Sequence, residues 1–330
     1  MKKPVFKLFH KIIVLSLLLG VTFLLISCAA NISGSAVKEE TLKNPEVYFC
    51  PKNDCGRVFE ENINAANDSV HCAIYDINLK NVINSLSQKS KSADVKVVMD
   101  NSNNHGQIKG DGVKEDSPNQ LMHNKFCVID KKLVLTGSFN PTDNDNSKNN
   151  NNVIVIYSKT LAENYEDEFN EPWHGTFSGG SKVKHPIIYL NEMEIENYFC
   201  LEDNCASHIA DLIKNAKKSV YFMDFSFTNN EIADAIISKK NLDTRGVVDA
   251  GQSSNKFSQL KRLQENGIHV IKDKNKYKMH HKVFIIDNET VATGSFNPTA
   301  SGDEKNDENV IIIHDKNITS DFLGEFDSIS

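Results

Sequence analysis

Two stretches of this 330-residue chain carry the same chemical groups in the same order. The first begins at His123-Asn124-Lys125 and the second at His280-His281-Lys282, 157 residues further on. Each continues through an apolar run to an aspartate and then reaches Gly-Ser-Phe-Asn-Pro-Thr at the same distance. An imidazole can act as a nucleophile or transfer a proton, and an ammonium group binds anions. Two matched copies argue against chance and point to chemistry on an anion such as a phosphate.

Local patterns indicate where these side chains point. The apolar, partly β-branched runs 126–129 and 283–286 predict buried strands. Residues two apart on a strand share a face, so each histidine should project beside the lysine of its own copy. Gly137 and Gly294 should let the backbone approach a ligand. Short polar side chains follow these glycines and could reach the same ligand: Ser138, Asn140, Ser295 and Asn297.

The doubled His-x-Lys-x4-Asp pattern with Gly-Ser-x-Asn downstream resembles the phospholipase D superfamily, over roughly residues 45–330. The resemblance implies an α/β fold, a duplicated phospholipase D-like αβα sandwich whose halves are related by pseudo-two-fold symmetry and share one active site. The stretch Lys305–Asn309 is most similar to the small endonuclease-like branch. The expected organisation is an N-terminal segment, a linker, a first half, a second linker and a second half: 1–30, 31–44, 45–175, 176–194 and 195–330.

The resemblance also implies roles. One histidine would form a phosphohistidine, and the other would protonate the leaving group and then activate water. The phosphate would be held by Lys125, Lys282, Asn140 and Asn297. Asp130 and Asp287 lie an odd number of residues from the lysines and are expected to face away, as structural or supporting residues. No cofactor and no metal are expected, because no His/Asp/Glu cluster has clear ligand spacing. His281 is expected to be structural, and His314 has no partner visible in the sequence.

An asymmetry between the copies suggests which histidine does what. In the nuclease-like relatives a glutamate after the motif pairs with the catalytic histidine, and this chain keeps it as Glu308. The matching residue of the first copy is Asn151. A carboxylate raises a histidine pKa and an amide does not. The sequence therefore predicts His280 as the proton donor and His123 as the nucleophile.

Strand and helix patterns alternate through both halves, which predicts an α/β sandwich with a mixed or parallel sheet in each. The halves diverge before the second histidine, where 257–265 fits an extra helix and the matching region 100–123 predicts an open loop. The elements expected in both halves pair as 58–67 with 207–217, 70–77 with 220–227, 80–90 with 230–239, 95–99 with 245–248, 153–157 with 310–314, and closing helices around 165–169 and 322–326.

The cysteines indicate an oxidising compartment. Two Cys-x4-Cys pairs, displaced by 150 residues, predict the local disulfides Cys50 to Cys55 and Cys200 to Cys205. A four-cysteine zinc site across the halves is the alternative, although the spacing is loose for zinc. Cys72 and Cys127 fall within apolar strands and are expected to be buried thiols.

The N-terminus resembles an export signal. Four lysines precede an uncharged run from Ile12 to Ile26 and then Ser27-Cys28. This arrangement is similar to a bacterial lipoprotein signal, in which Cys28 would be lipidated. The alternative is an uncleaved anchor, since 12–30 is long enough to span a bilayer. Both interpretations place the catalytic part outside the cytoplasm, anchored to the membrane of the cell envelope.

Charge limits the partners. The chain has a formal net charge of -7, and removal of residues 1–27 removes four lysines and no acids, which leaves -11. General nucleic-acid binding needs a basic surface, which so acidic a chain lacks. Lysines at spacing two lead into His280, either as a solvated strand edge or as a patch that steers phosphates: Lys272, Lys274, Lys276 and Lys278.

These observations favour a phosphodiester hydrolase that acts through a phosphohistidine, as a monomer with two internal halves. Membrane anchoring and acidity favour hydrolysis or transfer of phospholipid head groups. Motif detail favours the alternative, a metal-independent endonuclease. A third hypothesis is a non-catalytic anion-binding protein of the envelope, against which the presence of both histidines and both lysines argues.

Overall fold

The computed structural model describes residues 36–108, 112–117 and 120–330. Within these, Val37–Ser330 forms one compact unit. The predicted signal segment 1–30, its lipidation site Cys28 and the first residues of the expected linker lie outside the described residues.

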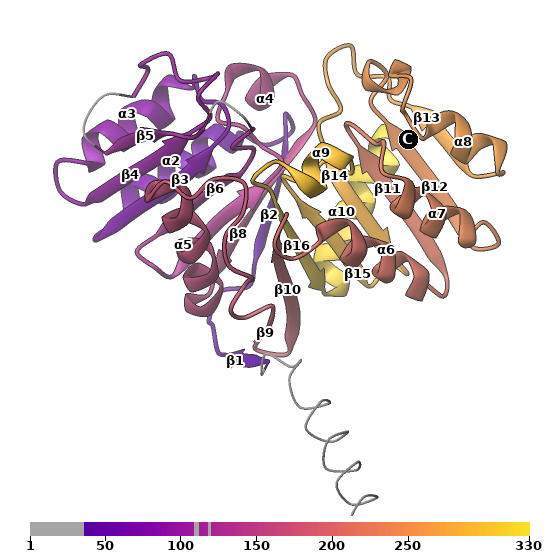
Figure 1. The fold of residues 1–330 in the computed structure, drawn as a ribbon. Helices are drawn as coiled ribbons and strands as arrows, with labels where there is room; N and C mark the ends of the chain where they lie inside the picture. Colours follow the sequence, from indigo (N-terminus) through magenta and orange to yellow (C-terminus); the bar gives the residue numbers. More distant parts are fainter. Residues whose placement is uncertain (1–35, 109–111, 118–119) are drawn as a thin grey trace, which may run out of the picture. The chain divides into compact units, whose positions relative to one another are not determined.

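Two sheets carry the fold (Figure 1). The strands of the first sheet, in spatial order, are β2 (Glu46–Cys50), β8 (Asn151–Tyr157), β7 (Leu133–Gly137), β6 (Lys125–Ile129), β3 (Ser69–Ile74), β4 (Asp94–Met99) and β5 (Val113–Glu115). The strands of the second are β1 (Val37–Glu39), β9 (Ile187–Leu190), β10 (Met193–Phe199), β16 (Asn309–His314), β15 (Thr290–Gly294), β14 (Lys282–Ile286), β11 (Ser219–Asp224), β12 (Asp243–Val248) and β13 (His269–Lys272).

The strand order confirms the duplication. The series from β2 to β5 is repeated as β10 to β13, and β9 and β1 extend the second sheet at one edge. In both copies the last three strands of the series run parallel and the others pair antiparallel. The sheets are therefore mixed, and the predicted α/β class is confirmed.

Helices cover both faces of the sheets. Those of the first half are α2 (Cys55–Ala65), α3 (Lys80–Lys89), α4 (Asp143–Ser147) and α5 (Lys159–Trp173). Those of the second are α6 (Cys205–Asn215), α7 (Asn230–Ser238), η1 (Gln252–Ser254), α8 (Leu260–Glu265), α9 (Ala300–Glu304) and α10 (Lys316–Ile329). None of the helices in these described ranges is long and apolar enough to cross a membrane.

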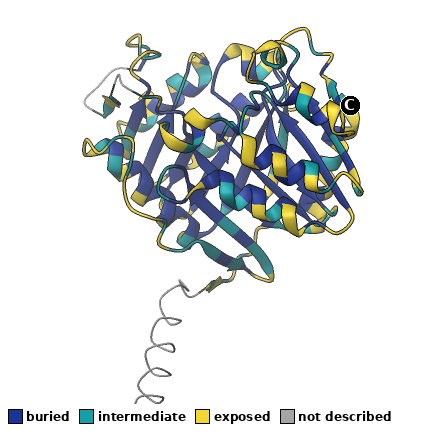
Figure 2. Ribbon diagram, turned by 45° about the vertical axis from the view of Figure 1, so that its right-hand side comes forward, coloured by how far each residue is buried: buried dark blue, intermediate teal, exposed yellow. Residues whose placement is uncertain are grey.

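Three apolar clusters fill the spaces between these layers. One lies under α2 and α3 and a second under α6, α7 and α8. The third joins the halves, because it contains Phe126 and Tyr165 from the first together with Met223 and Phe326 from the second. Figure 2 shows that most strand residues are buried, that some strand segments are intermediate or exposed, and that the outer faces of the helices are exposed. Strands covered on both faces explain why β6 and β14 are continuous apolar runs in the sequence.

Some segments differ from the sequence-based expectations. The expected linkers contain β1 and β9, which pair with each other in parallel and add to the second sheet. The expected open loop contains β5, which pairs with β4. The extra helix of the second half is only α8, and Phe257 lies before it with 64% of its surface exposed. Short edge strands carry too few residues for a clear period, which is why their patterns were not recognised.

The cysteine prediction is confirmed for the two local pairs, Cys50–Cys55 and Cys200–Cys205, each closing the turn before a helix. The zinc alternative is wrong, since these sulfurs are bonded to one another. The expectation of buried thiols is also wrong, because Cys72 and Cys127 form a third disulfide. They are direct register partners on β3 and β6, which are neighbours in space but not in sequence.

Candidate active site

Each histidine precedes a central strand that begins at its lysine. Lys125 opens β6 and Lys282 opens β14, and the two lysines are 1% and 2% exposed. Each Nζ donates a hydrogen bond to the backbone carbonyl of the histidine two residues earlier, at 2.5 Å in the first copy and 2.7 Å in the second. The structure therefore places each histidine and its lysine side by side, as the period of a strand predicts.

Both histidines line one cavity of about 370 Å³. Its other lining residues come from both halves: Tyr75, Asp76, Leu121, Asn140, Thr142, Asn144, Asp145, Asn149, Phe225, Ser226, Gln252, Lys278, Asn297 and Thr299. Reciprocal backbone contacts bring the halves together here. The His123 N–H donates to the Asp307 carbonyl, and the His280 N–H donates to the Asn150 carbonyl. The two distant copies thus share a single site.

The partners of the two imidazoles are exchanged between the halves. His123 Nδ1 lies 2.8 Å from a carboxylate oxygen of Glu308, and His280 Nδ1 lies 2.8 Å from the amide oxygen of Asn151. The prediction that Glu308 assists His280 is therefore wrong. The bridge between Met122 and Asp307 holds the Glu308 segment against the first histidine. The assignment of His280 as proton donor loses its basis, because the carboxylate belongs to His123.

The two histidines differ electrostatically. Burial lowers the pKa of His123, and the adjacent Glu308 carboxylate opposes part of that decrease. Burial also lowers the pKa of His280, to well below its usual range, and Lys282 and Lys125 lower it further. The structure therefore favours the imidazolium form at His123 over His280.

The two lysines form a buried cationic pair. Burial lowers the pKa of Lys125 to about 8, although Glu308 and Asp145 raise it. Burial and then the charge of Lys125 lower the pKa of Lys282 well below its usual range. Nearby carboxylates, Glu308 and Asp145, already favour the charged form of both lysines, and a phosphate entering the cavity would favour it further.

The polar residues after the glycines separate into two groups. Asn140 and Asn297 line the cavity, and the Oδ1 atom of each is buried with no hydrogen-bond partner among the described residues. Ser138 and Ser295 are fully buried and do not line it. Their hydroxyls accept the backbone N–H groups of Asn152 and Asn309. The expectation that these serines reach a ligand is not met, and they instead hold the strand that follows.

The two motif glycines allow the backbone to pack closely against the strand that follows in each half. Gly137 and Gly294 have φ values of 139° and 146°. A Cβ at Gly137 would lie 2.4 Å from the Asn152 carbonyl oxygen, and one at Gly294 would lie 2.2 Å from that of Asn309. Only glycine permits so close an approach. The closely approaching group is therefore the neighbouring strand and not a ligand, which corrects the sequence-based interpretation.

The two motif aspartates lie at the far ends of β6 and β14. Asp130 accepts backbone N–H groups from Asn67, Asp68 and Ser69, and Asp287 accepts those of residues 217–219. Burial alone would raise the pKa of Asp130, but these hydrogen bonds lower it well below its usual range. Each aspartate ties a helix-to-strand turn to the motif strand, which is a structural position.

Sequence reasoning missed most of the cavity wall, including three residues that lie against the histidines. Tyr75 and Phe225 place their rings edge-on to His123 and His280, with centroids 4.8 and 4.7 Å apart. The 150-residue displacement already seen in the cysteines relates these two aromatics and could have identified them. Asp145 also lines the cavity, but the second copy has Gly302 there, so the repeat gave no signal for it.

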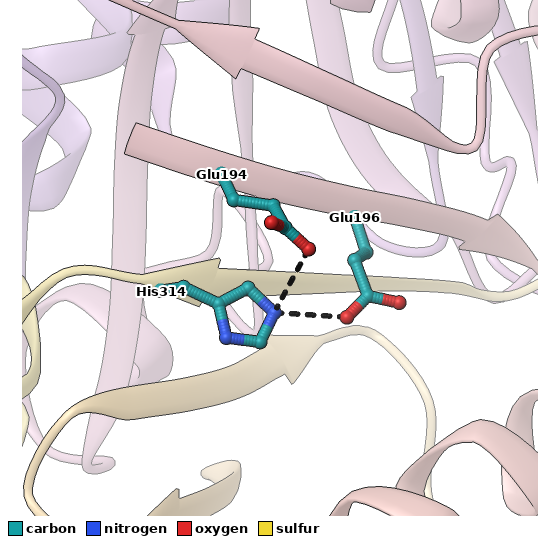
Figure 3. Close-up of side chains that lie close together, drawn as sticks. All are labelled: Glu194, Glu196 and His314. Carbon is teal, nitrogen blue, oxygen red and sulfur yellow. Dashed lines mark hydrogen bonds and ion pairs between the residues drawn. The ribbon is translucent and has the colours of Figure 1, made fainter. Parts of the chain in front are cut away.

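The other histidines in the described part of the chain lie outside this cavity. His281 is fully buried against Asn152 and Glu325, which agrees with a structural position. His314 lies opposite Glu194 in the pairing of β16 with β10, with Glu196 on the same face (Figure 3). Ligand atoms of these three lie within 4.8 Å of one another, close enough to share a metal ion. Hydrogen bonds from Nε2 to Glu196, at 2.8 Å, and between Nδ1 and Thr290, at 2.9 Å, account for the geometry without one.

The comparisons with known proteins identify the family. A family model described as "Cardiolipin synthase, PLD-like domain" matches residues 59–173 and 209–330, which are the two copies. The chain therefore belongs to the phospholipase D superfamily. It is 35% identical over 145 residues to a phospholipase D of Rickettsia bellii, covering 43% of this chain and 72% of the relative.

Two further matches extend the comparison. A mitochondrial cardiolipin hydrolase of Chlamydomonas reinhardtii is 30% identical over 125 residues, which are 37% of this chain and 56% of that protein. The phosphatidylserine synthase of Haemophilus influenzae covers 85% of both chains with a TM-score of 0.63 and 12% identity. At that identity the likeness shows that the whole two-sheet fold is shared.

The hydrogen bond between Glu308 and His123 predicts how the pKa of His123 changes when the carboxylate is removed. Replacing Glu308 by Gln should lower the pKa of His123 further, by about one to three units, because an opposite charge in contact favours the charged imidazole. Imidazole nitrogen NMR against pH measures it, with the exposed Glu304→Gln as the matched control. An unchanged pKa of His123, or a decrease at His280 alone, would contradict the pairing.

Proposed function

We propose that this protein is a phospholipid phosphodiesterase that works through a phosphohistidine intermediate. The observation that carries the proposal is the convergence of both histidines on one cavity, each with a buried lysine hydrogen-bonded to its backbone carbonyl. A phosphodiester is an anion that resists nucleophilic attack, so its hydrolysis needs charge neutralisation, a nucleophile and a proton donor. The two lysines and the two histidines supply these groups at one place.

The electrostatics favour His280 as the nucleophile and His123 as the acid, the reverse of the sequence-based assignment. His280 Nε2 attacks phosphorus while the bond from phosphorus to the leaving oxygen breaks, and that oxygen takes the proton from His123 Nε2. His123 then removes a proton from water, whose oxygen attacks phosphorus and releases His280. Glu308 stabilises the imidazolium form that His123 needs in order to donate its proton.

The apolar part of the cavity wall supports a lipid substrate. Tyr75, Leu121 and Phe225 line it beside the histidines, and Leu121 is 37% exposed. Lys278 is its single exposed lysine among the described lining residues, and no arginine lines it there. The other three lysines of the run before His280 do not line it, so a long basic groove is missing from its described wall. The names of the relatives, phospholipase D and cardiolipin hydrolase, point in the same direction.

We also propose that the protein acts outside the cytoplasm, anchored through Cys28 at the membrane, as a monomer. Three disulfides within Val37–Ser330 support an oxidising compartment. An anchor would keep the cavity near lipid head groups. Both histidines come from one chain, so one molecule holds a full set of the proposed catalytic groups.

The substrate proposal predicts selective turnover by the detergent-purified full chain in EDTA. Vesicles containing phosphatidylglycerol or phosphatidylcholine should release a labelled head group, whereas single- and double-stranded DNA and RNA should remain intact. His280→Ala should abolish the release. Cleaved nucleic acid with intact lipid would instead support the endonuclease alternative. No turnover of lipid, nucleic acid or bis(p-nitrophenyl) phosphate would support the non-catalytic alternative.

The assignment of roles predicts where the intermediate forms. With bis(p-nitrophenyl) phosphate, whose leaving group needs no acid, His123→Ala should accumulate a phosphorylated His280, because the base for the second step is missing. Steady-state turnover should fall by more than about a thousandfold in His123→Ala and in His280→Ala. Mass spectrometry at alkaline pH locates the phosphoryl group, and the exposed His269→Ala is the control. Phosphate found on His123 in His280→Ala would reverse the assignment.

The anchoring proposal predicts lipid on Cys28. Expressed in a bacterium, the wild-type chain should incorporate radioactive fatty acid and sediment with membranes, and Cys28→Ser should lose the label. Cys72→Ser is a control for labelling at other cysteines. Membrane-bound protein without label would support the uncleaved anchor, and an unlabelled protein in the soluble fraction would contradict both forms of anchoring.

A further inference from the structure

Two matched positions beside His280 differ in their carboxylates between the two copies. Position 151 holds an amide where the second copy has Glu308, and position 145 holds Asp145 where the second copy has Gly302. The first copy has thus lost one acid and carries another six residues earlier. The two differences lie on the same side of the cavity, because Asn151 and Asp145 both approach Nδ1 of His280.

Asp145 is held rigidly in that place. It lies in α4, its backbone N–H is capped by the Thr142 hydroxyl, and it is 4% exposed. Its Oδ2 accepts hydrogen bonds from the backbone N–H and side-chain amide of Asn140, at 3.0 and 2.8 Å. Its Oδ1 accepts from the Asn149 amide at 2.6 Å. A carboxylate fixed by three donors cannot turn away from the cavity when charge develops there.

The distance to His280 indicates an electrostatic contact. Asp145 Oδ2 lies 3.7 Å from His280 Nδ1, whereas Asn151 accepts the hydrogen bond from that nitrogen at 2.8 Å. The charged or titratable groups that act most strongly on His280 are cationic or become so: Lys125, His123, Lys278 and Lys282. Glu308 is bonded to His123 instead, and Asp76 and Asp224 act on the lysines, as Asp145 also does.

The second copy could not hold an acid in the same way. A Cβ at Gly302 would lie 2.4 Å from the Asn297 carbonyl oxygen, which forbids any side chain without movement of the backbone. The carboxylate at this position is therefore a feature of the first half alone. Of the two motif histidines, Asp145 lies near His280, whose Nδ1 is hydrogen-bonded to an amide and not to a carboxylate.

We propose that Asp145 is a positioning residue for His280, whose charge stabilises the positive imidazole that forms when Nε2 attacks phosphorus. This inference rests on the proposed function. Asn151 orients the ring through the Nδ1 proton, and Asp145 supplies the negative charge that an amide cannot supply. Together they replace, for His280, the single glutamate that serves His123.

The test is a charge swap within the first half. Asp145→Asn retains the size of the side chain and should lower kcat/KM by roughly 10- to 100-fold, mostly through kcat, because a charge about 4–6 Å away shifts a pKa by about one to three units. Adding Asn151→Glu to this variant should restore most of the activity at pH values above the raised pKa of His280, where the ring is neutral before attack, since it returns a carboxylate to Nδ1. Asp143→Asn, an exposed carboxylate on the same helix, is the matched control and should behave as wild type.

A pH profile separates charge from structure. Activity should rise as His280 loses its proton, and this acidic limb should move to lower pH in Asp145→Asn and to higher pH in Asn151→Glu. Wild-type activity in Asp145→Asn, failure of Asn151→Glu to rescue it, or an effect on KM alone would overturn the inference. Asp145→Ser supplies the same comparison if Asp145→Asn does not fold.

The activities of His280→Ala and Asp145→Asn distinguish failure of the proposed function from failure of this inference. Full activity in His280→Ala would remove the phosphohistidine mechanism and this inference with it. An inactive His280→Ala beside a fully active Asp145→Asn would remove this inference alone.

Discussion

The exchange of side-chain partners between the two halves is the constraint on which the site depends. Glu308 reaches His123 and Asn151 reaches His280, so Nδ1 of each imidazole is bonded to the other half. The same exchange is repeated beneath them, where Thr136 donates to Asn309 and Thr293 donates to Asn152. These polar contacts are buried, and a buried polar group without its partner costs about 1–3 kcal/mol. Separating the halves would therefore disrupt the geometry of both histidines at once.

An apolar interface holds the two halves together around these exchanged contacts. The shared core cluster fills the space behind the cavity with side chains from both sheets and from α5 and α10. It excludes water from the ends of β6 and β14, which is why the lysines there are almost fully buried. Low polarity strengthens the attraction of both ammonium groups for an anion. The packing that joins the halves thus also sets the charge balance that the proposed reaction needs.

The sequence predicted the features that depend on local pattern. It did not predict contacts between residues that are far apart in the sequence. The duplication, the central strands, the local disulfides and the placing of each histidine beside its lysine followed from spacing alone. Glu308 was assigned to the wrong histidine because a repeated sequence does not say whether a residue serves its own copy or the other. The pairing of Cys72 with Cys127 depends on β3 and β6 being neighbours, which spacing cannot show. Asp145 has no repeat to mark it, and His314 meets its partners from a segment more than a hundred residues away.

A perfectly symmetric site would give two equivalent histidines, and either could begin the reaction. This chain instead surrounds them unequally. His123 is hydrogen-bonded to a carboxylate, which favours a ring that already carries its proton. His280 is hydrogen-bonded to an amide among cations, which favours a neutral ring with an available electron pair at Nε2.

A nucleophilic imidazole must be neutral before it attacks and becomes positive only afterwards. A carboxylate hydrogen-bonded to Nδ1 would therefore favour the protonated ring before attack. A carboxylate at 3.7 Å has a weaker pull on that proton and still lies close enough to act on the charge that attack creates. The unequal surroundings would thereby give the proposed reaction a fixed direction within a duplicated fold.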